Sequence, residues 1–212
     1  MATPAPGTVG ALGEFGLIQA VAARLPQGRG VLLGPGDDAA IVASPDGRTV
    51  VTVDLLVEGR HFRRDWSSAA DVGHKAAAQN LADVAAMGAR PHSLVVGLGV
   101  PAELPVDWVL ELADGLQAEC ATVGASVVGG DLVRSDAVTI AVTALGDLGG
   151  RDPVTRSGAR PGDVVALVGR LGWAAGGTAV LTRGFPGHVL RGCWRLIIAP
   201  HDILRAAFGA LD

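Results

Sequence analysis

Lysine and cysteine are scarce in this sequence of 212 residues, and long apolar runs are absent. Lys75 is the only lysine and falls inside a helical pattern, which excludes a P-loop, because that phosphate-binding loop ends in Gly-Lys-Ser/Thr. Cys120 and Cys193 have no metal-ligand spacing, so we interpret them as buried thiols in a reducing cytoplasm. No apolar stretch approaches the roughly 18–20 residues of a membrane span, and residues 1–10 lack the pattern of a signal peptide. We therefore expect a soluble, cytoplasmic protein.

Several common functional motifs are also missing. The net charge of −4 gives no basic footprint for nucleic acid or an anionic membrane. No Gly-x-Gly-x-x-Gly opens a helix after a strand, the five histidines have no zinc spacing, and no Gly-x-Ser-x-Gly elbow occurs. These absences argue against a Rossmann dinucleotide site, a zinc site and a serine hydrolase.

What the sequence does contain is an alternation of strand-like and helix-like segments, with 49% apolar residues to build a core. The periodicity predicts helices over residues 13–25, 68–87, 107–123 and 173–182, and strands over 31–33, 39–43, 50–57, 93–100, 126–128, 138–145 and 164–168. Ser68 with Asp71 predicts a capped helix start, and Gly88 its end. The composition becomes polar and turn-rich after Gly149. We predict an α/β (α+β) fold with a mixed sheet, divided into domains 1–150 and 151–212.

Aspartates are the most informative residues, because several are expected at strand ends. Asp37 and Asp38 follow the strand 31–33 and a Gly-Pro-Gly turn, and Asp131 follows the strand 126–128 and two glycines. Carboxylates that converge on one cleft need cations, and hard oxygen ligands suit Mg²⁺. The glycines beside them allow backbone N–H groups to approach a phosphate. This pattern favours a metal–phosphate site for phosphoryl transfer.

Two further acids lie inside regular elements. Asp54 interrupts the apolar strand 50–57, with Thr52 two residues earlier on the same face. Asp83 shares a helical stripe with Lys75 and Gln79. Two other residues are candidates for ligand contacts: His61 just after the Asp54 strand, and Arg156, which would clamp a phosphate.

Each candidate also has a purely structural interpretation. Asp beside Gly is common in turns, which applies to Asp37, Asp38 and Asp131. Asp54 would equally suit an exposed edge strand, since an unpaired buried charge is costly. Asp83 fits a solvated helix face, and His61 and Arg156 fit exposed loops. Spacing alone leaves these alternatives open.

A series of motifs in the sequence resembles the thiamine-monophosphate kinase family. The resemblance runs from about residue 13 to about residue 180, and the order of the motifs makes it specific. Its segments are Gly13-Glu14-Phe15, Gly34-Pro35-Gly36-Asp37-Asp38-Ala39-Ala40, Val53-Asp54-Leu55-Leu56-Val57, Gly59-Arg60-His61-Phe62, Lys75-Ala76-Ala77-Ala78-Gln79-Asn80-Leu81-Ala82-Asp83-Val84-Ala85-Ala86-Met87-Gly88-Ala89, Val128-Gly129-Gly130-Asp131 and Thr155-Arg156-Ser157-Gly158.

The resemblance implies a PurM-like fold, in which the N-terminal domain forms a half-barrel sheet flanked by helices and pairs with its copy in a homodimer. It also implies a second α/β domain, truncated here. The transfer from ATP to thiamine monophosphate, giving thiamine diphosphate, would be direct and in line, with no residue acting as a covalent nucleophile. Carried over by position, the Mg²⁺ ligands would be Asp38, Thr52, the backbone at Val53, Asp54, Asp83 and Asp131. Gly130, Asp131 and Arg156 would meet ATP, and His61 the thiamine phosphate.

The sequence departs from the family at its C-terminal side. The family's Asp-x-Ser-Asp-Gly-Leu and Gly-Gly-Glu-Asp segments do not occur before Asp212. Two alternatives therefore stay open: a truncated, non-catalytic relative that keeps dimerisation and partial nucleotide binding, and another ATP-using member of the same superfamily.

Overall fold

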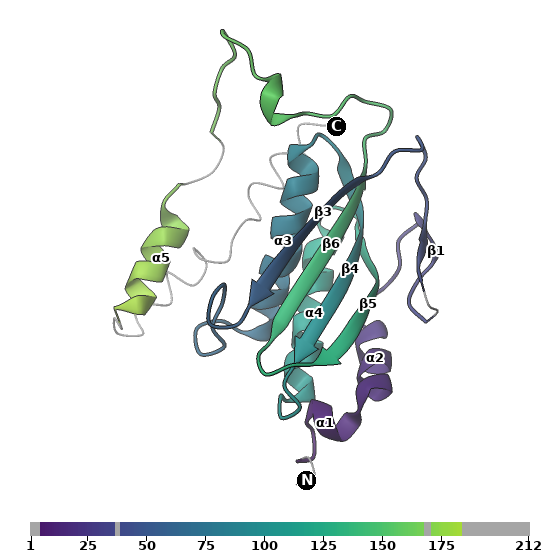
Figure 1. Ribbon diagram of the computed structural model, residues 1–212, viewed down its shortest axis with the longest axis vertical. Helices are drawn as coiled ribbons and strands as arrows, with labels where there is room; N and C mark the ends of the chain where they lie inside the picture. Colours follow the sequence, from purple (N-terminus) through teal and green to yellow (C-terminus); the bar gives the residue numbers. More distant parts are fainter. Residues whose placement is uncertain (1–4, 37–38, 168–170, 184–212) are drawn as a thin grey trace.

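A four-stranded mixed sheet forms the centre of the computed structural model, which describes residues 5–36, 39–167 and 171–183 (Figure 1). The strand order is β3 (Val50–Val57), β6 (Thr139–Asp147), β4 (Arg90–Val100) and β5 (Ser126–Arg134). β6 pairs antiparallel with both β3 and β4, whereas β4 and β5 are parallel and are joined by the crossover helix α4 (Val106–Ala121). β3 and β5 are thus the two edge strands.

Helices α3 (Ala69–Ala86) and α4 cover one face of the sheet and leave the other open (Figure 1). Strand β6 shows why, because Ile140, Val142 and Ala144 are fully buried and alternate with partly exposed residues. The buried side chains meet the apolar stripe of α3 in one continuous core. Each strand therefore has a helix-side row and an open-side row of side chains.

The start and end of α3 confirm the sequence-based prediction. Ser68 accepts a hydrogen bond from the backbone of Asp71, whose side chain in turn accepts from the backbone of Ser68. After the last turn, Gly88 adopts a φ of +75°, a conformation that favours glycine.

Helices α3 and α4 approach closely through two glycines. A Cβ on Gly73 would lie 2.2 Å from the carbonyl oxygen of Leu112, and one on Gly115 would lie 2.1 Å from that of Ala70. Any larger side chain would push the helices apart, so these glycines fix how deeply α3 sits against its neighbours.

The N-terminal segment packs beside β5. It contains α1 (Val9–Leu12), which the sequence did not predict, then α2 (Glu14–Ala22), with Leu17 fully buried. A small hairpin follows, made of β1 (Val31–Leu33) and β2 (Ile41–Val42).

Beyond β6 the described residues contain only a 3₁₀ turn, η1 (Arg156–Gly158), and α5 (Trp173–Thr182). The predicted helix 173–182 is confirmed. The predicted strand 164–168 is wrong over residues 164–167, where Val164 and Val165 are 90% and 97% exposed and pair with no strand, and residue 168 lies outside the described part. No second sheet is present in the described ranges after residue 147.

No helix among the described residues is long and apolar enough to cross a membrane.

Candidate active site

The helix-side row of edge strand β3 carries two of the predicted site residues. Alternate residues of β3 pair with the buried row of β6 and therefore lie on the helix side of the sheet. These residues are Val50, Thr52, Asp54 and Leu56. The expectation that Thr52 and Asp54 lie on one face is confirmed. Both are partly buried, whereas Val51, Val53 and Leu55 point to the open side and are at least half exposed. β3 is an edge strand, so its outer side also offers unpaired backbone groups, which a metal contact at Val53 would need.

Asp83 joins this row from the last turns of α3. The Thr52 hydroxyl donates a hydrogen bond to Asp83 Oδ2 over 3.3 Å. The donated proton orients the hydroxyl, and its oxygen lone pairs remain available to a cation. Thr52 of β3 and Asp83 of α3, 31 positions apart in sequence, thus meet, and Asp54 lies on the same face two residues further along β3. We call Thr52, Asp54 and Asp83 the oxygen-rich group.

His61 lies beyond the other end of β3, in the β3–α3 loop. Its Nδ1 accepts a hydrogen bond of 3.0 Å from the backbone N–H of Val57. The ring proton of a neutral His61 therefore sits on Nε2, which is exposed and able to donate to a phosphate oxygen. Lys75 of α3 donates to the His61 carbonyl oxygen over 2.5 Å. Burial lowers the pKa of Lys75.

Asp131 does not lie with the other acids. We expected it just after a strand, but β5 continues to Arg134, so Gly129, Gly130 and Asp131 are inside the strand and not in a turn. Asp131 pairs with Gly97 in the row that continues to Ala141 and Leu55, which is the open side of the sheet. It is thus on the opposite edge and the opposite face from Asp54, about 14 Å away across three strand spacings.

Gly130 has a packing role that the sequence did not reveal. It lies in the same helix-side row as Asp54, and a Cβ there would be 2.1 Å from the carbonyl oxygen of Val96 in β4. The register between β4 and β5 shifts just before this point, which brings the two backbones together. Glycine is therefore required at 130 for strand packing, whatever the backbone also does for a ligand.

The remaining predicted residues are only partly placed. Arg156 is exposed in η1, two residues after Val154, whose backbone N–H donates to the Met87 carbonyl oxygen over 3.0 Å. Asp37 and Asp38 lie outside the described residues. Among the residues that the structure describes, no three His, Cys, Asp or Glu side chains are grouped closely enough to hold a metal ion. The predicted convergence of three or four acids is thus not found within the described part of one chain.

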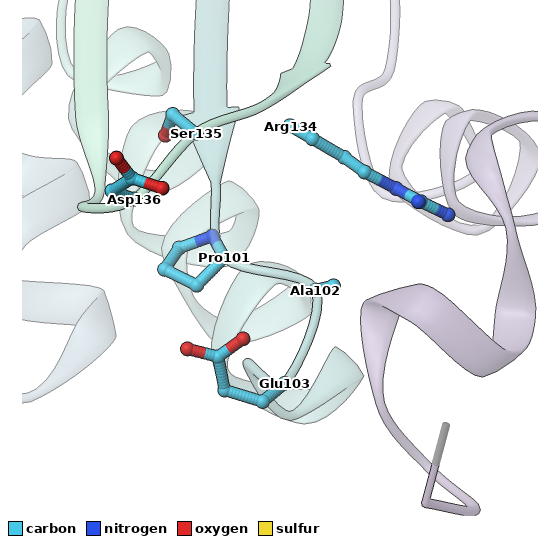
Figure 2. Close-up of a pocket in the computed structure, with 6 residues that line it drawn as sticks. All are labelled: Pro101, Ala102, Glu103, Arg134, Ser135 and Asp136. Atoms are coloured by element: carbon cyan, nitrogen blue, oxygen red, sulfur yellow. The ribbon is translucent and has the colours of Figure 1, made fainter. Parts of the chain in front are cut away.

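A pocket of about 340 Å³ lies elsewhere, between the end of β4 and the β5–β6 turn (Figure 2). Its lining includes Glu103 and Asp136, while Arg134 points away toward the N-terminal helices (Figure 2). It contains none of the predicted site residues and offers no group of cations for a phosphate.

The thiols match the sequence-based prediction as far as they are described. Cys120 is fully buried, and burial raises its pKa to about 12, so it is an unreactive thiol at neutral pH. Cys193 lies outside the described residues.

Comparison with known proteins identifies relatives for most of the chain. Residues 36–148 match the family model described as AIR synthase related protein, N-terminal domain. The thiamine-monophosphate kinase of Mycobacterium tuberculosis is 48% identical over 213 residues, which cover 99% of this chain and 64% of the relative. The chain thus spans 64% of the length of this relative and about half of the length of other curated relatives that it matches.

Solved structures show the same arrangement. The thiamine monophosphate kinase of Aquifex aeolicus superposes with a TM-score of 0.70 at 28% identity, covering 93% of this chain and 63% of that one. A complex of AaThiL with AMPPCP and TMP gives a TM-score of 0.70 at 29% identity, covering 93% and 62%.

Proposed function

Because the chain belongs to the AIR synthase related family, and within it to the thiamine-monophosphate kinases, we propose that it carries out the ATP-dependent phosphorylation of thiamine monophosphate to thiamine diphosphate. The transfer would be direct and in line, with Mg²⁺ and without a covalent enzyme intermediate. The described residues would supply the N-terminal part of the site. The part of the relatives that this chain does not cover would supply the rest.

The observation that carries this proposal is the group formed by Thr52, Asp54 and Asp83. Their two carboxylates and one hydroxyl are hard oxygen donors of the type that Mg²⁺ prefers; Thr52 and Asp54 are partly buried, and Asp83 is exposed. We propose that these side chains hold Mg²⁺ together with the Val53 backbone, Asp38 and Asp131. The ion would supply charge neutralisation at the phosphate oxygens during transfer.

The order of the residues along β3 suits an in-line reaction. Helix α3 runs antiparallel to β3, with Asp83 beside Thr52 and Lys75 beside the His61 loop. The segment that carries Arg156 is fastened at Met87, one helical turn beyond Asp83. Nucleotide contacts at Arg156 and substrate contacts at His61 would then lie on opposite sides of the acids, as a nucleotide and an acceptor phosphate must when they react in line.

We also propose that the protein works as a homodimer joined through the open face of the sheet. This face exposes a row of apolar side chains that are each at least 38% exposed: Val51, Val53, Leu55, Val95 and Val133. Burying such a patch against a second copy is favourable. In such a dimer, the β5 edge of the second copy would lie beside the β3 edge of the first. The partner's Asp131 would then lie near Asp54 and Asp83, from which Asp131 is separated within one chain.

Residues 151–212 are proposed to begin a second domain. Their described part contains η1 and α5, and α5 stands apart from the sheet (Figure 1). In the Mycobacterium tuberculosis relative, about a third of the length lies outside the part that matches this chain.

Calorimetric titration with AMPPCP in the presence and absence of Mg²⁺, together with an assay for thiamine diphosphate formation, tests the proposal. We expect Mg²⁺-dependent nucleotide binding that Asp54→Asn abolishes and Asp65→Asn, an exposed acid outside the site, leaves unchanged. Turnover on the 212-residue chain would establish the kinase. Binding without turnover would favour the alternative of a truncated, non-catalytic relative, and no Mg²⁺-dependent binding would contradict both.

A further inference from the structure

The path of the chain after β6 is fixed by a cluster of contacts that the proposed reaction does not use directly. Gly149 and Gly150 both adopt positive φ values, +59° and +80°, which turn the chain away from the end of β6. Residues 150–154 are then attached at two places, one in the turn between β2 and β3 and one at the end of α3.

The first attachment is the turn between β2 and β3. Asp46 Oδ2 accepts a hydrogen bond of 3.2 Å from the backbone N–H of Gly150. The Arg48 guanidinium donates to the Arg151 carbonyl oxygen over 3.1 Å. The same guanidinium pairs with Asp46 through two hydrogen bonds of 2.8 and 3.1 Å, and the Asp46 carboxylate also accepts from the Arg48 backbone N–H. One carboxylate thus joins the turn and the linker, and Arg48 lowers the pKa of Asp46, keeping it ionised at neutral pH.

The second attachment is the C-terminal end of α3. The backbone N–H of Val154 donates to the Met87 carbonyl oxygen, and the Val154 side chain packs on Gly88, where a Cβ would come within 3.0 Å of it. Two residues further on is Arg156, at most about 7 Å of extended chain from Val154. Met87 is one helical turn from Asp83, about 6 Å along the axis.

We infer that Asp46 is a positioning residue for Arg156: with Arg48 it fastens the linker so that Arg156 enters the nucleotide side of the site next to Asp83. This inference rests on the proposed function, because it assigns Arg156 to the nucleotide. An ion pair that contacts only its own turn could not position the linker. Asp46 can do so because its side chain is only 16% exposed and accepts hydrogen bonds both from Arg48 in its own turn and from Gly150 in the linker.

The matched control is Asp65, which also pairs with an arginine two residues away, Arg63, but is 60% exposed and, in the described part of the chain, forms no hydrogen bond with the linker. We expect Asp46→Ala to speed hydrogen exchange at the Gly150 and Val154 amides at least tenfold relative to Asp65→Ala. We also expect Asp46→Ala to weaken Mg·AMPPCP binding about five- to tenfold while the unfolding midpoint stays close to that of Asp65→Ala. Asp46→Asn, which keeps one acceptor oxygen but loses the charge, should fall between Ala and the wild type.

A double-mutant cycle with Arg156→Ala separates positioning from general destabilisation. If Asp46 acts through Arg156, Asp46→Ala will weaken binding less than twofold when Arg156 is already absent. Equal losses in both backgrounds, or linker exchange no faster than in Asp65→Ala, would overturn the inference while leaving the proposed function intact. Failure of the wild-type chain to bind Mg·AMPPCP would instead refute the proposed function, and with it the role assigned to Arg156.

Discussion

The Lys75 ammonium donates a 2.5 Å hydrogen bond to the carbonyl oxygen of His61, so the sole lysine of the chain connects α3 to the β3–α3 loop. Two further hydrogen bonds close this loop. His61 Nδ1 accepts from the backbone N–H of Val57, and the backbone N–H of His61 donates to the Val57 carbonyl oxygen. Lys75 thereby connects the helix that carries Asp83 to the residue proposed to meet the thiamine phosphate.

Replacing Lys75 should loosen His61 without disturbing the acids. A hydrogen bond from a charged donor contributes about 1.5–3 kcal/mol, so Lys75→Met should weaken thiamine monophosphate binding about tenfold or more. Lys75→Arg, which keeps a cationic donor, should lose less. Calorimetric titration with thiamine monophosphate measures this effect. Titration with Mg·AMPPCP is the control, because we assign His61 to the thiamine phosphate and not to the nucleotide. A parallel loss of both affinities would contradict a role confined to the His61 loop.

The pKa of Lys75 gives a second, independent prediction. Burial disfavours its charged form, so Lys75 should titrate below the ordinary lysine value of 10.5. Between the two pKa values the unfolded chain holds more protons than the folded chain, and this residue's contribution therefore makes stability increase with pH across that window. With ¹³C-lysine labelling, the one lysine gives one set of side-chain resonances, which can be titrated in native protein and in urea. A native midpoint at or above the unfolded one would refute the prediction.

Two adjacent glycines in β5 should respond very differently to alanine. Gly130→Ala would place its Cβ against the Val96 backbone of a central strand, which cannot move aside, whereas the space beside Gly129 is open. We expect Gly130→Ala to cost about 1–3 kcal/mol of stability and Gly129→Ala to stay within about 0.5 kcal/mol of the wild type. Urea unfolding midpoints provide the measurement, and equal midpoints would contradict the close contact. A loss of nucleotide binding in Gly130→Ala would thus not by itself indicate a phosphate contact.

Local patterns predicted most of the elements as far as β6, but not the way in which they meet. The alternation in residues 50–57 correctly put Thr52 and Asp54 on one face, because side-chain direction in a strand depends only on parity. The two glycines before Asp131 suggested a turn, yet β4 pairs with them and extends β5 to Arg134. The strand order separates Asp54 from Asp131, and the docking of α3 brings Asp83 to Thr52. Both depend on contacts between residues far apart in the sequence, so the spacing of residues could not predict them.

The docking of α3 itself should depend on Gly73 and Gly115. Alanine at either site would meet the backbone of the opposite helix, and overpacking of this kind costs about 1–3 kcal/mol. Because Asp83 reaches Thr52 only while α3 keeps its position, we expect Mg²⁺ affinity to decrease together with stability. Gly176→Ala in α5 is the control, since nothing lies within 4 Å and alanine favours a helix, by about 0.4–1 kcal/mol. Unchanged unfolding midpoints in Gly73→Ala and Gly115→Ala would show that the helices can separate without cost.

The position of Asp131 leads to the sharpest prediction about the assembly. If two copies share each site, Asp54 and Asp83 of one chain act with the partner's Asp131. A mixed dimer of an Asp54→Asn chain and an Asp131→Asn chain then contains one site with both substitutions and one with neither. Neither variant alone should bind Mg·AMPPCP, whereas the co-expressed pair, purified through two different tags, should bind at half the wild-type stoichiometry.

The control follows from the same geometry. Asp54 and Asp83 flank Thr52 within one chain, so a mixed dimer of Asp54→Asn and Asp83→Asn chains has one substitution in each site and should not recover binding. Recovery by the first pair but not by the second requires that Asp131 come from the other copy. Absence of recovery in both would place all the acids on one chain, and Asp131 would then need a backbone rearrangement to cross the sheet, which the paired register of β4 and β5 opposes.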